Sequence, residues 1–550
     1  MRKKFKFFFH IVFVFTLTSS GFAKDDLSIR TDLFRETCDR GAGPWYIIEG
    51  QEDNGNRIQI TRLDRGSLSF LKDKGTVLFC EGESFFSGLV TTNEINFVGY
   101  GNRNRIIVMP VQNYYFNILS LRQESLNQLF EMLEITQNDL TLVGLDIREY
   151  PSGLVSPESF DELKIYIENV TFTQDNPDGQ KFKDNDINNV LTPEFGDINF
   201  FETDLRGKAR HEENIDGHGP AAIQINREST NLVMDRVVFK EHSVNGQIMR
   251  LHTNLTLKMN DVVFSNNKNN LLLATGNIKY ADIENIEIIN NIKGSLFFYN
   301  NLRGNTGDNQ ISFLDGVISK NASTALTIIG MSTEIQGLSF VRNGGTDIPD
   351  QPDVNTLQII ANEKDNVNIQ NSNFIENNNF DLFIHNGWGS ISESNFMNNY
   401  SPLSILHLSG IEHKVIDSNF EKNEIAGALG LIAANSQVSL IRSYVVDNNY
   451  SFPRNPEMPF SLFSIIDRES VAVPTYERYI DDPIDPRQSG RSIKFKDTYF
   501  QHSLEADRDE VSIIGFYDLD GSGQERIYFE RFDEGVNTKD CFWDGNTFCR

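Results

Sequence analysis

The chain has 550 residues, of which 50 are Lys or Arg and 77 are Asp or Glu, so its formal net charge at pH 7 is −27. A surface this acidic repels nucleic acids and anionic lipids, which excludes both as main partners. It suits basic partners, divalent cations and neutral sugars. An anionic polysaccharide would need calcium or a local basic patch to bind.

The first 23 residues have the pattern of a secretory signal peptide. A start with four basic residues precedes an apolar run from Phe7 to Leu17, and small residues follow at Gly21 and Ala23. This run is too short to span a bilayer, and we expect cleavage after Ala23. The mature chain then carries 46 basic and 77 acidic side chains, a net charge of −31. We expect no transmembrane segment, and a protein that is secreted, periplasmic or at the cell surface.

Four cysteines flank the two ends of the remaining chain. Cys38 and Cys80 lie near its start, and Cys541 and Cys549 lie near its end. Export permits disulfides, although four cysteines allow three connectivities. We expect Cys38 to pair with Cys80 and Cys541 with Cys549, as links within an N-terminal cap at residues 24–74 and a C-terminal cap at residues 504–550.

A short motif recurs between residues 367 and 449. Its central apolar residue is Phe374, Phe396, Phe420 and then Val445, with steps of 22, 24 and 25 residues. Such a period is typical of a solenoid, with one coil per repeat. The same anchor position can be placed twelve times in all, at Ile147, Phe172, Phe239, Phe264, Ile288, Ile318, Phe340, Phe374, Phe396, Phe420, Val445 and Phe500.

The residues around each anchor predict short strands and sharp corners. The residue five before the anchor is apolar in all twelve cases, and the residues between are mostly polar, as in a half-buried strand. Three residues after the anchor, asparagine occupies eight successive repeats, from Asn267 to Asn448. Stacked asparagines chain their amide hydrogen bonds and tolerate a left-handed backbone. The sequence therefore predicts an all-β, single-stranded parallel β-helix with three strands per coil.

We place this β-helix at residues 75–503, with about thirteen coils and a length of roughly 60 Å. Residues 75–109 are its expected opening coil. Residues 121–135 have an amphipathic helical pattern and are expected to cover the flank or the open N-terminal end of the stack. Irregular anchor spacing predicts three insertions, at about residues 175–220, 342–366 and 451–490.

The Phe-x-x-Asn steps at Phe264, Phe340, Phe374, Phe396 and Phe420 resemble those of right-handed parallel β-helix proteins. These form the pectin-lyase-like superfamily, and the repeats are also similar to passenger repeats of polymorphic outer-membrane proteins. The resemblance implies a right-handed coil. It also implies a candidate function, because many members of the superfamily are polysaccharide lyases or glycoside hydrolases.

Two short motifs are candidate chemical sites. Gly217-His218-Gly219 is similar to a motif of polygalacturonases, but the paired aspartates and the basic partner of that family are missing, so His218 is a weak catalytic candidate. Asp518 and Asp520 alternate as calcium ligands do, although Phe529 stands where an EF-hand needs an acid. His413 falls in an inward column, and we expect a core or corner histidine bonded to a neighbouring carbonyl.

One outward column places acids in successive coils. Glu168, Asp235, Asn260 and Glu284 lie four residues before their anchors, and Arg236 and Asp261 follow in the next outward column. Acids one strand apart repel unless a cation, a basic side chain or sugar hydroxyls lie among them. We therefore expect ligand-binding residues here, with Glu168 and Asp235 also as acid/base candidates. The alternative is a solvated acidic stripe.

The first insertion leaves the stack between Glu168 and Asp235, so its Lys208, Arg210, His211 and His218 are expected to wall a groove over this stripe. The whole sequence favours an exported, monomeric, non-catalytic protein that presents a long flank to a polysaccharide or a surface protein. The rival is a polysaccharide lyase or glycoside hydrolase of the same fold. No cofactor is required, and calcium is the one candidate ion.

Overall fold

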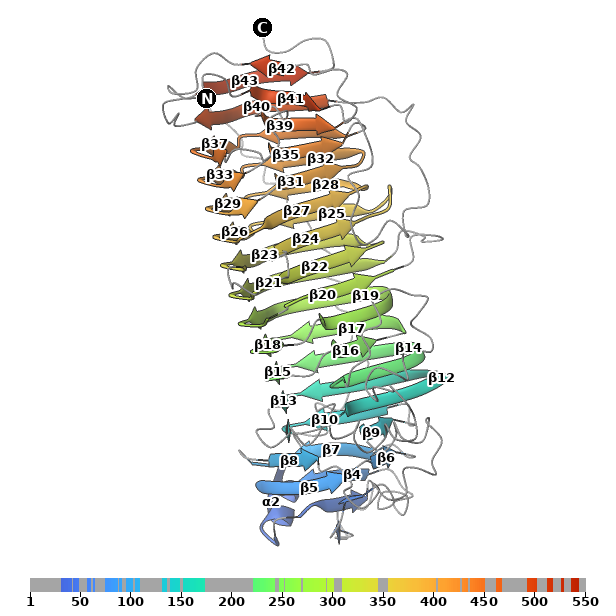
Figure 1. Ribbon diagram of the computed structural model, residues 1–550. Helices are drawn as coiled ribbons and strands as arrows, with labels where there is room; N and C mark the ends of the chain where they lie inside the picture. Colours follow the sequence, from blue (N-terminus) through green and yellow to red (C-terminus); the bar gives the residue numbers. More distant parts are fainter. Residues whose placement is uncertain are drawn as a thin grey trace, which may run out of the picture.

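A computed structural model describes residues 31–48, 57–60, 63–64, 75–108, 131–173, 221–300, 309–344, 355–450, 461–466, 492–501, 512–517, 526–528 and 536–543, with short breaks inside several of these ranges. The described part is a long stack of strands that runs from helix α2 (Thr31–Cys38) to strand β43 (Val536–Trp543), as Figure 1 shows. Nearly all its ladders are parallel, which confirms an all-β solenoid of parallel strands.

The strands form three parallel ladders, which we name sheets A, B and C. Sheet B contains β4 (Gly75–Phe79), β7 (Ile95–Gly99), β10 (Asp139–Val143), β12 (Ser152–Glu168), β14 (Ile223–Asp235), β17 (Asn254–Asn260), β19 (Leu271–Ile289), β21 (Gln310–Ser319), β23 (Ser332–Val341), β25 (Asn366–Gln370), β28 (Trp388–Ser392), β32 (Glu412–Ile416), β36 (Gln437–Ile441) and β40 (Ser492–Gln501).

Sheet C follows sheet B within each coil and holds the anchor residues. It contains β3 (Leu63–Asp64), β5 (Gly82–Ser87), β8 (Asn104–Val108), β11 (Asp146–Arg148), β13 (Thr171–Thr173), β15 (Val238–Lys240), β18 (Val263–Ser265), β26 (Asn373–Ile375), β29 (Asn395–Met397), β33 (Asn419–Glu421) and β37 (Tyr444–Val446). The ends of β19, β21, β23 and β40 complete it, because these strands continue through the bend.

Sheet A closes each coil. It contains β6 (Leu89–Thr91), β9 (Glu131–Ile135), β16 (Gln247–Leu251), β20 (Leu296–Tyr299), β22 (Thr324–Ile329), β24 (Asn355–Ile360), β27 (Phe380–His385), β31 (Ser404–Ser409), β35 (Ala428–Ala433), β39 (Ser461–Ile466) and β41 (Ser512–Tyr517), with the starts of β12, β14 and β19. Three short strands, β30 (Tyr400–Ser401), β34 (Glu424–Ile425) and β38 (Asn449–Tyr450), pair separately between sheets C and A.

The interior is one continuous apolar cluster from Tyr46 to Phe500. The register places anchor upon anchor, so Phe172 stacks on Phe239 and Phe374 on Phe396, with ring centroids 5.1 and 4.7 Å apart. The residue two before each anchor also faces inward, since Val170 and Ser394 are fully buried. The predicted inward columns are therefore confirmed.

The predicted asparagine column is a hydrogen-bonded ladder. Each Asn Nδ2 from Asn267 to Asn423 donates to the Oδ1 of the next Asn at 2.9–3.0 Å, and each backbone N–H of the same residues donates to that oxygen too. All eight side chains are buried. The ladder supplies the polar partners that a buried corner requires.

The bend between sheets B and C has a left-handed residue in successive coils. Gly144, Asn169, Arg236, Asp261 and Asp417 are among them, with φ between 50° and 67°. Two outward residues, such as Glu168 and Asn169, can therefore follow one another between the inward Ile167 and Val170, which explains the break in alternation that the sequence shows.

Strands of opposite direction close both ends of the stack. Strand β1 (Trp45–Ile48) pairs antiparallel with β4 and with β2 (Arg57–Gln59), and β43 pairs antiparallel with β40. Strand β42 (Arg526–Tyr528) pairs antiparallel with β41. These pairings occupy edges that would otherwise recruit other chains.

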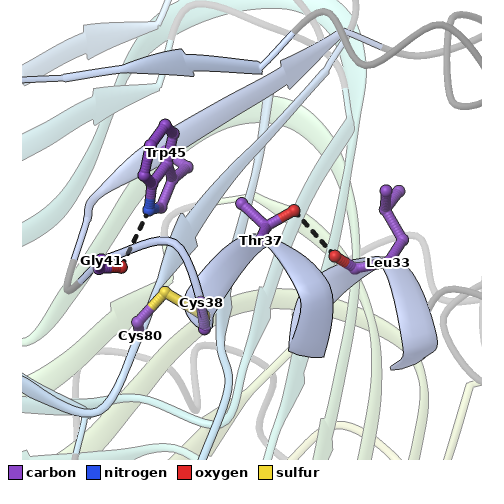
Figure 2. Close-up of a disulfide and its surroundings, with 6 residues drawn as sticks. All are labelled: Leu33, Thr37, Cys38, Gly41, Trp45 and Cys80. Atoms are coloured by element: carbon purple, nitrogen blue, oxygen red, sulfur yellow. Dashed lines mark hydrogen bonds between the residues drawn. A yellow bond between two sulfur atoms is a disulfide. The ribbon is translucent and has the colours of Figure 1, made fainter.

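The disulfide Cys38–Cys80 is present, with the two Cα atoms 5.4 Å apart, and joins helix α2 to the residue after β4 (Figure 2). Beside it, Trp45 Nε1 donates to the carbonyl of Gly41 at 3.1 Å. Cys541 lies in β43 and Cys549 lies outside the described residues, so the second pairing stays a prediction.

The structure differs from the sequence prediction in several places. Residues 131–135 form strand β9 of sheet A rather than the end of a helix, because β6 and β12 pair with this segment on both sides. Strands β24 and β39 lie inside two predicted insertions and pair within sheet A, so those insertions are shorter. Sheet A also continues past residue 503, as β41.

Several predicted features lie outside the described residues: the signal peptide at 1–23, the segment 121–130 and the whole of 175–220. Within the part that the structure describes, no helix has the length and apolarity needed to cross a membrane.

Candidate functional site: the outer face of sheet B

The outer face of sheet B, which we call the flank, has three outward positions per strand. On β28 they are Trp388, Ser390 and Ser392, and on β25 they are Asn366, Asn368 and Gln370. Register makes each position a column that runs along the stack. The column nearest the bend starts at Leu78 and Val98, where helix α2 packs over it through Phe34. The flank is thus covered at its N-terminal end.

The acidic column predicted from the sequence lies on this flank. Glu168, Asp235, Asn260 and Glu284 pair with one another in successive strands β12, β14, β17 and β19. Arg236 and Asp261 occupy left-handed positions at the bend beside them. The structure therefore brings together all five predicted ligand-binding residues.

Arg236 forms ion pairs with two of these acids. Its guanidinium contacts Asp235 Oδ2 at 2.7 Å and also bonds Glu168 on the neighbouring strand. Asn260 Nδ2 donates to Asp235 at 2.6 Å, and the Tyr166 hydroxyl donates to Glu168 at 2.7 Å. The two carboxylates are mostly shielded, with side-chain exposures of 13% and 15%. The basic side chain that the acidic column needs thus comes from Arg236 in the neighbouring column at the bend.

This network affects the chemistry that the acids can perform. Burial first, and then the hydrogen bond to Glu168, raise the pKa of Tyr166, so its hydroxyl keeps its proton. Glu168 and Asp235 already accept bonds from this hydroxyl, from Arg236 and from Asn260, which leaves them poorly placed as calcium ligands or as acid/base groups. The predicted groove residues His218, Lys208, Arg210 and His211 lie outside the described residues.

The described residues contain no group of three His, Cys, Asp or Glu side chains that could hold a metal ion. Asp518 and Asp520, the candidate calcium turn, lie outside them. A calcium requirement therefore stays untested.

Farther along the flank, an uncharged patch ends at Trp388, and the next strand places the Glu412–Lys414 ion pair beside it. We define this amide patch as the six outward residues of β25 and β28, which are Asn366, Asn368, Gln370, Trp388, Ser390 and Ser392. The indole is 47% exposed and its Nε1 donates to the carbonyl of Lys364 at 3.4 Å. Gly389 follows it because a Cβ there would lie 1.9 Å from the Val367 carbonyl oxygen. Strand β28 thus packs closely on β25 while the indole faces outward.

A second exposed aromatic residue, Tyr280, lies in the same column as Trp388. It is 39% exposed, and burial together with the nearby Asp282 raises the pKa of its hydroxyl. Ser312 donates to Asp282 at 2.9 Å on the next strand. Neither aromatic residue was predicted as a site residue. The signal was present, because both lie eight residues before an anchor, in an outward column.

The outer face of sheet A has a different character. Phe297, Ile329, Ile360 and Phe383 form a buried cluster on it. Beyond them, His407 lies edge-on to Phe383 at 4.5 Å, and Ser409 bonds His385 Nδ1 at 2.7 Å. Burial lowers the pKa of both histidines to about 4.

His413 lies in the interior, and its Nε2 bonds the carbonyl of Ser409 at 3.1 Å. The predicted core histidine is thus confirmed.

No family model matches the chain, and searches of curated proteins and of solved structures find no similar protein. The fold and the flank therefore rest on the sequence and the structure alone.

Proposed function

We propose that this protein is an exported, non-catalytic β-helix that binds an uncharged extracellular polysaccharide along its flank. The observation that supports this most is Trp388, an exposed indole at the edge of a patch of amides and hydroxyls, next to the Glu412–Lys414 ion pair of the following strand. Sugars present apolar faces to aromatic rings and hydroxyls to amides, so this combination suits them.

The charges of the flank favour a neutral ligand. The amide patch contains no ionisable side chain, while the chain as a whole has a net charge of −27. An anionic polysaccharide is repelled by this overall charge and finds no cation in the patch. A surface protein as partner is an alternative outcome, which a glycan screen separates.

The acidic residues of the flank give less support to a polysaccharide lyase or a glycoside hydrolase. A hydrolase needs two carboxyl groups free to act on one glycosidic bond, and the Glu168 and Asp235 carboxylates are bound by Arg236. Glu284 and Asp261 stand in the same stripe and remain candidate ligands. Release of sugar products would favour the enzymatic reading.

The finer fold assignment belongs to the same proposal. We place the stack with right-handed β-helices of the pectin-lyase-like kind, with about thirteen coils, because crossovers between parallel strands are right-handed in nearly all proteins. The recurring Phe-x-x-Asn steps support this assignment. The predicted signal peptide at residues 1–23 supports secretion, or a position in the periplasm or at the cell surface.

The experiment is a calorimetric screen of the full chain against mannan, xylan and β-glucan, with pectate and alginate as anionic controls, with and without calcium. We expect binding to a neutral polymer, weakened at least about tenfold by Trp388→Ala. Tyr444→Ala is the matched control, since Tyr444 is 56% exposed on sheet C. Absence of binding to every polymer, or equal weakening by both variants, refutes the proposal.

A further inference from the structure

Tyr280 and Trp388 lie in one outward column, which continues past them to Thr256 on one side and to Glu412 on the other. Register pairs Tyr280 with Gln310 and Gln310 with Ser332, and Asn366 with Trp388. The backbone N–H of Asn366 donates to Ser332 Oγ at 3.2 Å, which joins the two halves of the column. The two aromatic side chains are therefore four strand steps apart, or roughly 19 Å at the usual strand spacing.

The three positions between the two rings are uncharged. Gln310, Ser332 and Asn366 offer amide and hydroxyl groups, one per strand. The neighbouring column places Asp282 beside Tyr280, Ser312 beside Gln310 and Glu334 beside Ser332, which adds two carboxylates and a hydroxyl and no cation over these three strands. A row of acceptors and amides between two aromatic rings fits sugar hydroxyls and excludes acidic sugars by charge.

The shape of the column restricts the ligand further. The column is straight and repeats once per strand, and a sugar ring in an extended β-1,4-linked chain advances by about one strand step. A chain of about five rings therefore reaches from Tyr280 to Trp388 and meets each intermediate side chain in turn. A coiled α-1,4-linked chain leaves the column after a short distance.

We propose that the flank binds a linear, uncharged, β-1,4-linked polysaccharide lying parallel to the stack axis, with Tyr280 and Trp388 as its two end platforms. This inference rests on the proposed function and specifies its ligand. It makes affinity depend on chain length, because only a chain that spans the column contacts both rings.

The test compares di- and hexasaccharides of β-1,4-linked glucose, mannose and xylose with maltohexaose, an α-1,4-linked control, by calorimetry on the full chain. We expect one β-1,4 hexasaccharide to bind at least about tenfold more tightly than its disaccharide and than maltohexaose. Tyr280→Ala is expected to remove the advantage of the hexasaccharide and to leave disaccharide affinity unchanged. Tyr280→Phe keeps the ring and is expected to retain that advantage, and circular dichroism checks that each variant is folded.

The outcomes separate the two proposals. If a neutral polymer binds through Trp388 but Tyr280→Ala has no effect, or maltohexaose binds equally well, the axial β-linked chain is wrong while glycan binding at the flank stands. If no saccharide or polymer binds, the proposed function fails with it. An affinity for the hexasaccharide that falls with Tyr280→Ala and with Trp388→Ala, and not with Tyr444→Ala, supports the inference.

Discussion

Sheets A and B enclose the same interior, but their outer faces differ in how far they are exposed to solvent. The outer face of sheet B alternates with the interior in the ordinary way, so that β32 has exposed Glu412 and Lys414 between buried residues. The outer face of sheet A is buried as well, and every residue of β31 is shielded from solvent. Of these two faces, within the described residues, that of sheet B is therefore the one open to a large ligand, while much of the outer face of sheet A is buried.

The difference shows what hydrophobic alternation can and cannot reveal. In β27, the sequence Phe-Asp-Leu-Phe-Ile-His contains apolar residues on both sides of the strand, as a doubly buried strand does. In β25, the sequence Asn-Val-Asn-Ile-Gln alternates strictly. The sequence of each strand shows whether one or both of its faces are apolar. This difference can be interpreted only once the coil register has assigned each strand to its sheet.

The largest expected effect comes from the interior that both faces share. Phe396→Ala removes a fully buried ring from between Phe374 and Phe420 and is expected to cost about 3–5 kcal/mol of unfolding free energy. Chemical denaturation measures it. Tyr444→Ala, at an exposed site, should change stability by less than about 0.5 kcal/mol; similar losses in the two variants would contradict the assigned register.

The second prediction compares the two outer faces directly. Ile360→Ala, on the outside of sheet A, is expected to cost about 2–5 kcal/mol, because Ile360 is only 1% exposed. Leu314→Ala, on the outside of sheet B at 36% exposure, should cost less than about 1 kcal/mol. Equal costs by denaturation would remove the distinction between the faces.

The third prediction uses pH, to which sheet A should respond. His385 and His407 have pKa values of about 4 because they are buried. The unfolded chain protonates them near pH 6.5, so stability falls as pH decreases from about 6.5 to 4. Burial raises the pKa of Asp381 to about 7. The effect of Asp381 on stability has the opposite sign to that of the histidines, because only the folded state binds the proton of this carboxyl group in that pH range.

The two histidines destabilise the fold as pH decreases, and the one aspartate stabilises it. Together the three groups lower the unfolding free energy by about 1.4 kcal/mol for each pH unit of acidification. Melting temperatures of the wild type and of His385→Asn/His407→Gln, measured between pH 4.5 and 6.5, test it. The double variant should lose the histidine contribution and become less sensitive to acid. Parallel curves for the two proteins would show that the histidines are accessible to solvent.

The smallest effect concerns the charged part of the flank. Arg236→Ala leaves the shielded Glu168 and Asp235 carboxylates without their cation and is expected to cost about 1–3 kcal/mol in unfolding free energy. Arg442 bonds Asp417 on the same bend column, but both side chains are exposed. Arg442→Ala is the matched control and should leave the unfolding midpoint unchanged, since exposed pairs contribute little. High salt should not abolish the effect of Arg236→Ala, because the two carboxylates that it leaves unpaired are shielded from solvent.

Register explains why the sequence predicted so much of the fold. A column that repeats through Phe374, Phe396 and Phe420 determines which side chains face inward, and the same count located the acidic stripe and the asparagine turn. The register does not determine which side chains of neighbouring columns bond to one another. Spacing could place Arg236 beside Asp235, but the reach of its guanidinium to Glu168 depends on a left-handed corner.

The helix predicted at 121–135 was wrong over its described part, residues 131–135, for a related reason. Leu133 fits a helical face by spacing, but sheet A offers that segment a partner on each side, with Leu89 and Leu154 in register. Long-range pairing outweighs local propensity in such a short segment. Trp388 was missed because a lone exposed aromatic residue becomes notable only when its neighbours in other coils are known.

The asparagine ladder has a consequence for how such a chain can change over evolutionary time. Each rung donates to the next coil and accepts from the previous one, so every coil offers its neighbours the same interface. A whole coil of about 22 to 25 residues can therefore be duplicated or deleted without leaving an amide unpaired, provided that the antiparallel strands at both ends are kept. The length of the flank, and with it the length of the ligand that it can accommodate, becomes a quantity that natural selection can adjust one coil at a time.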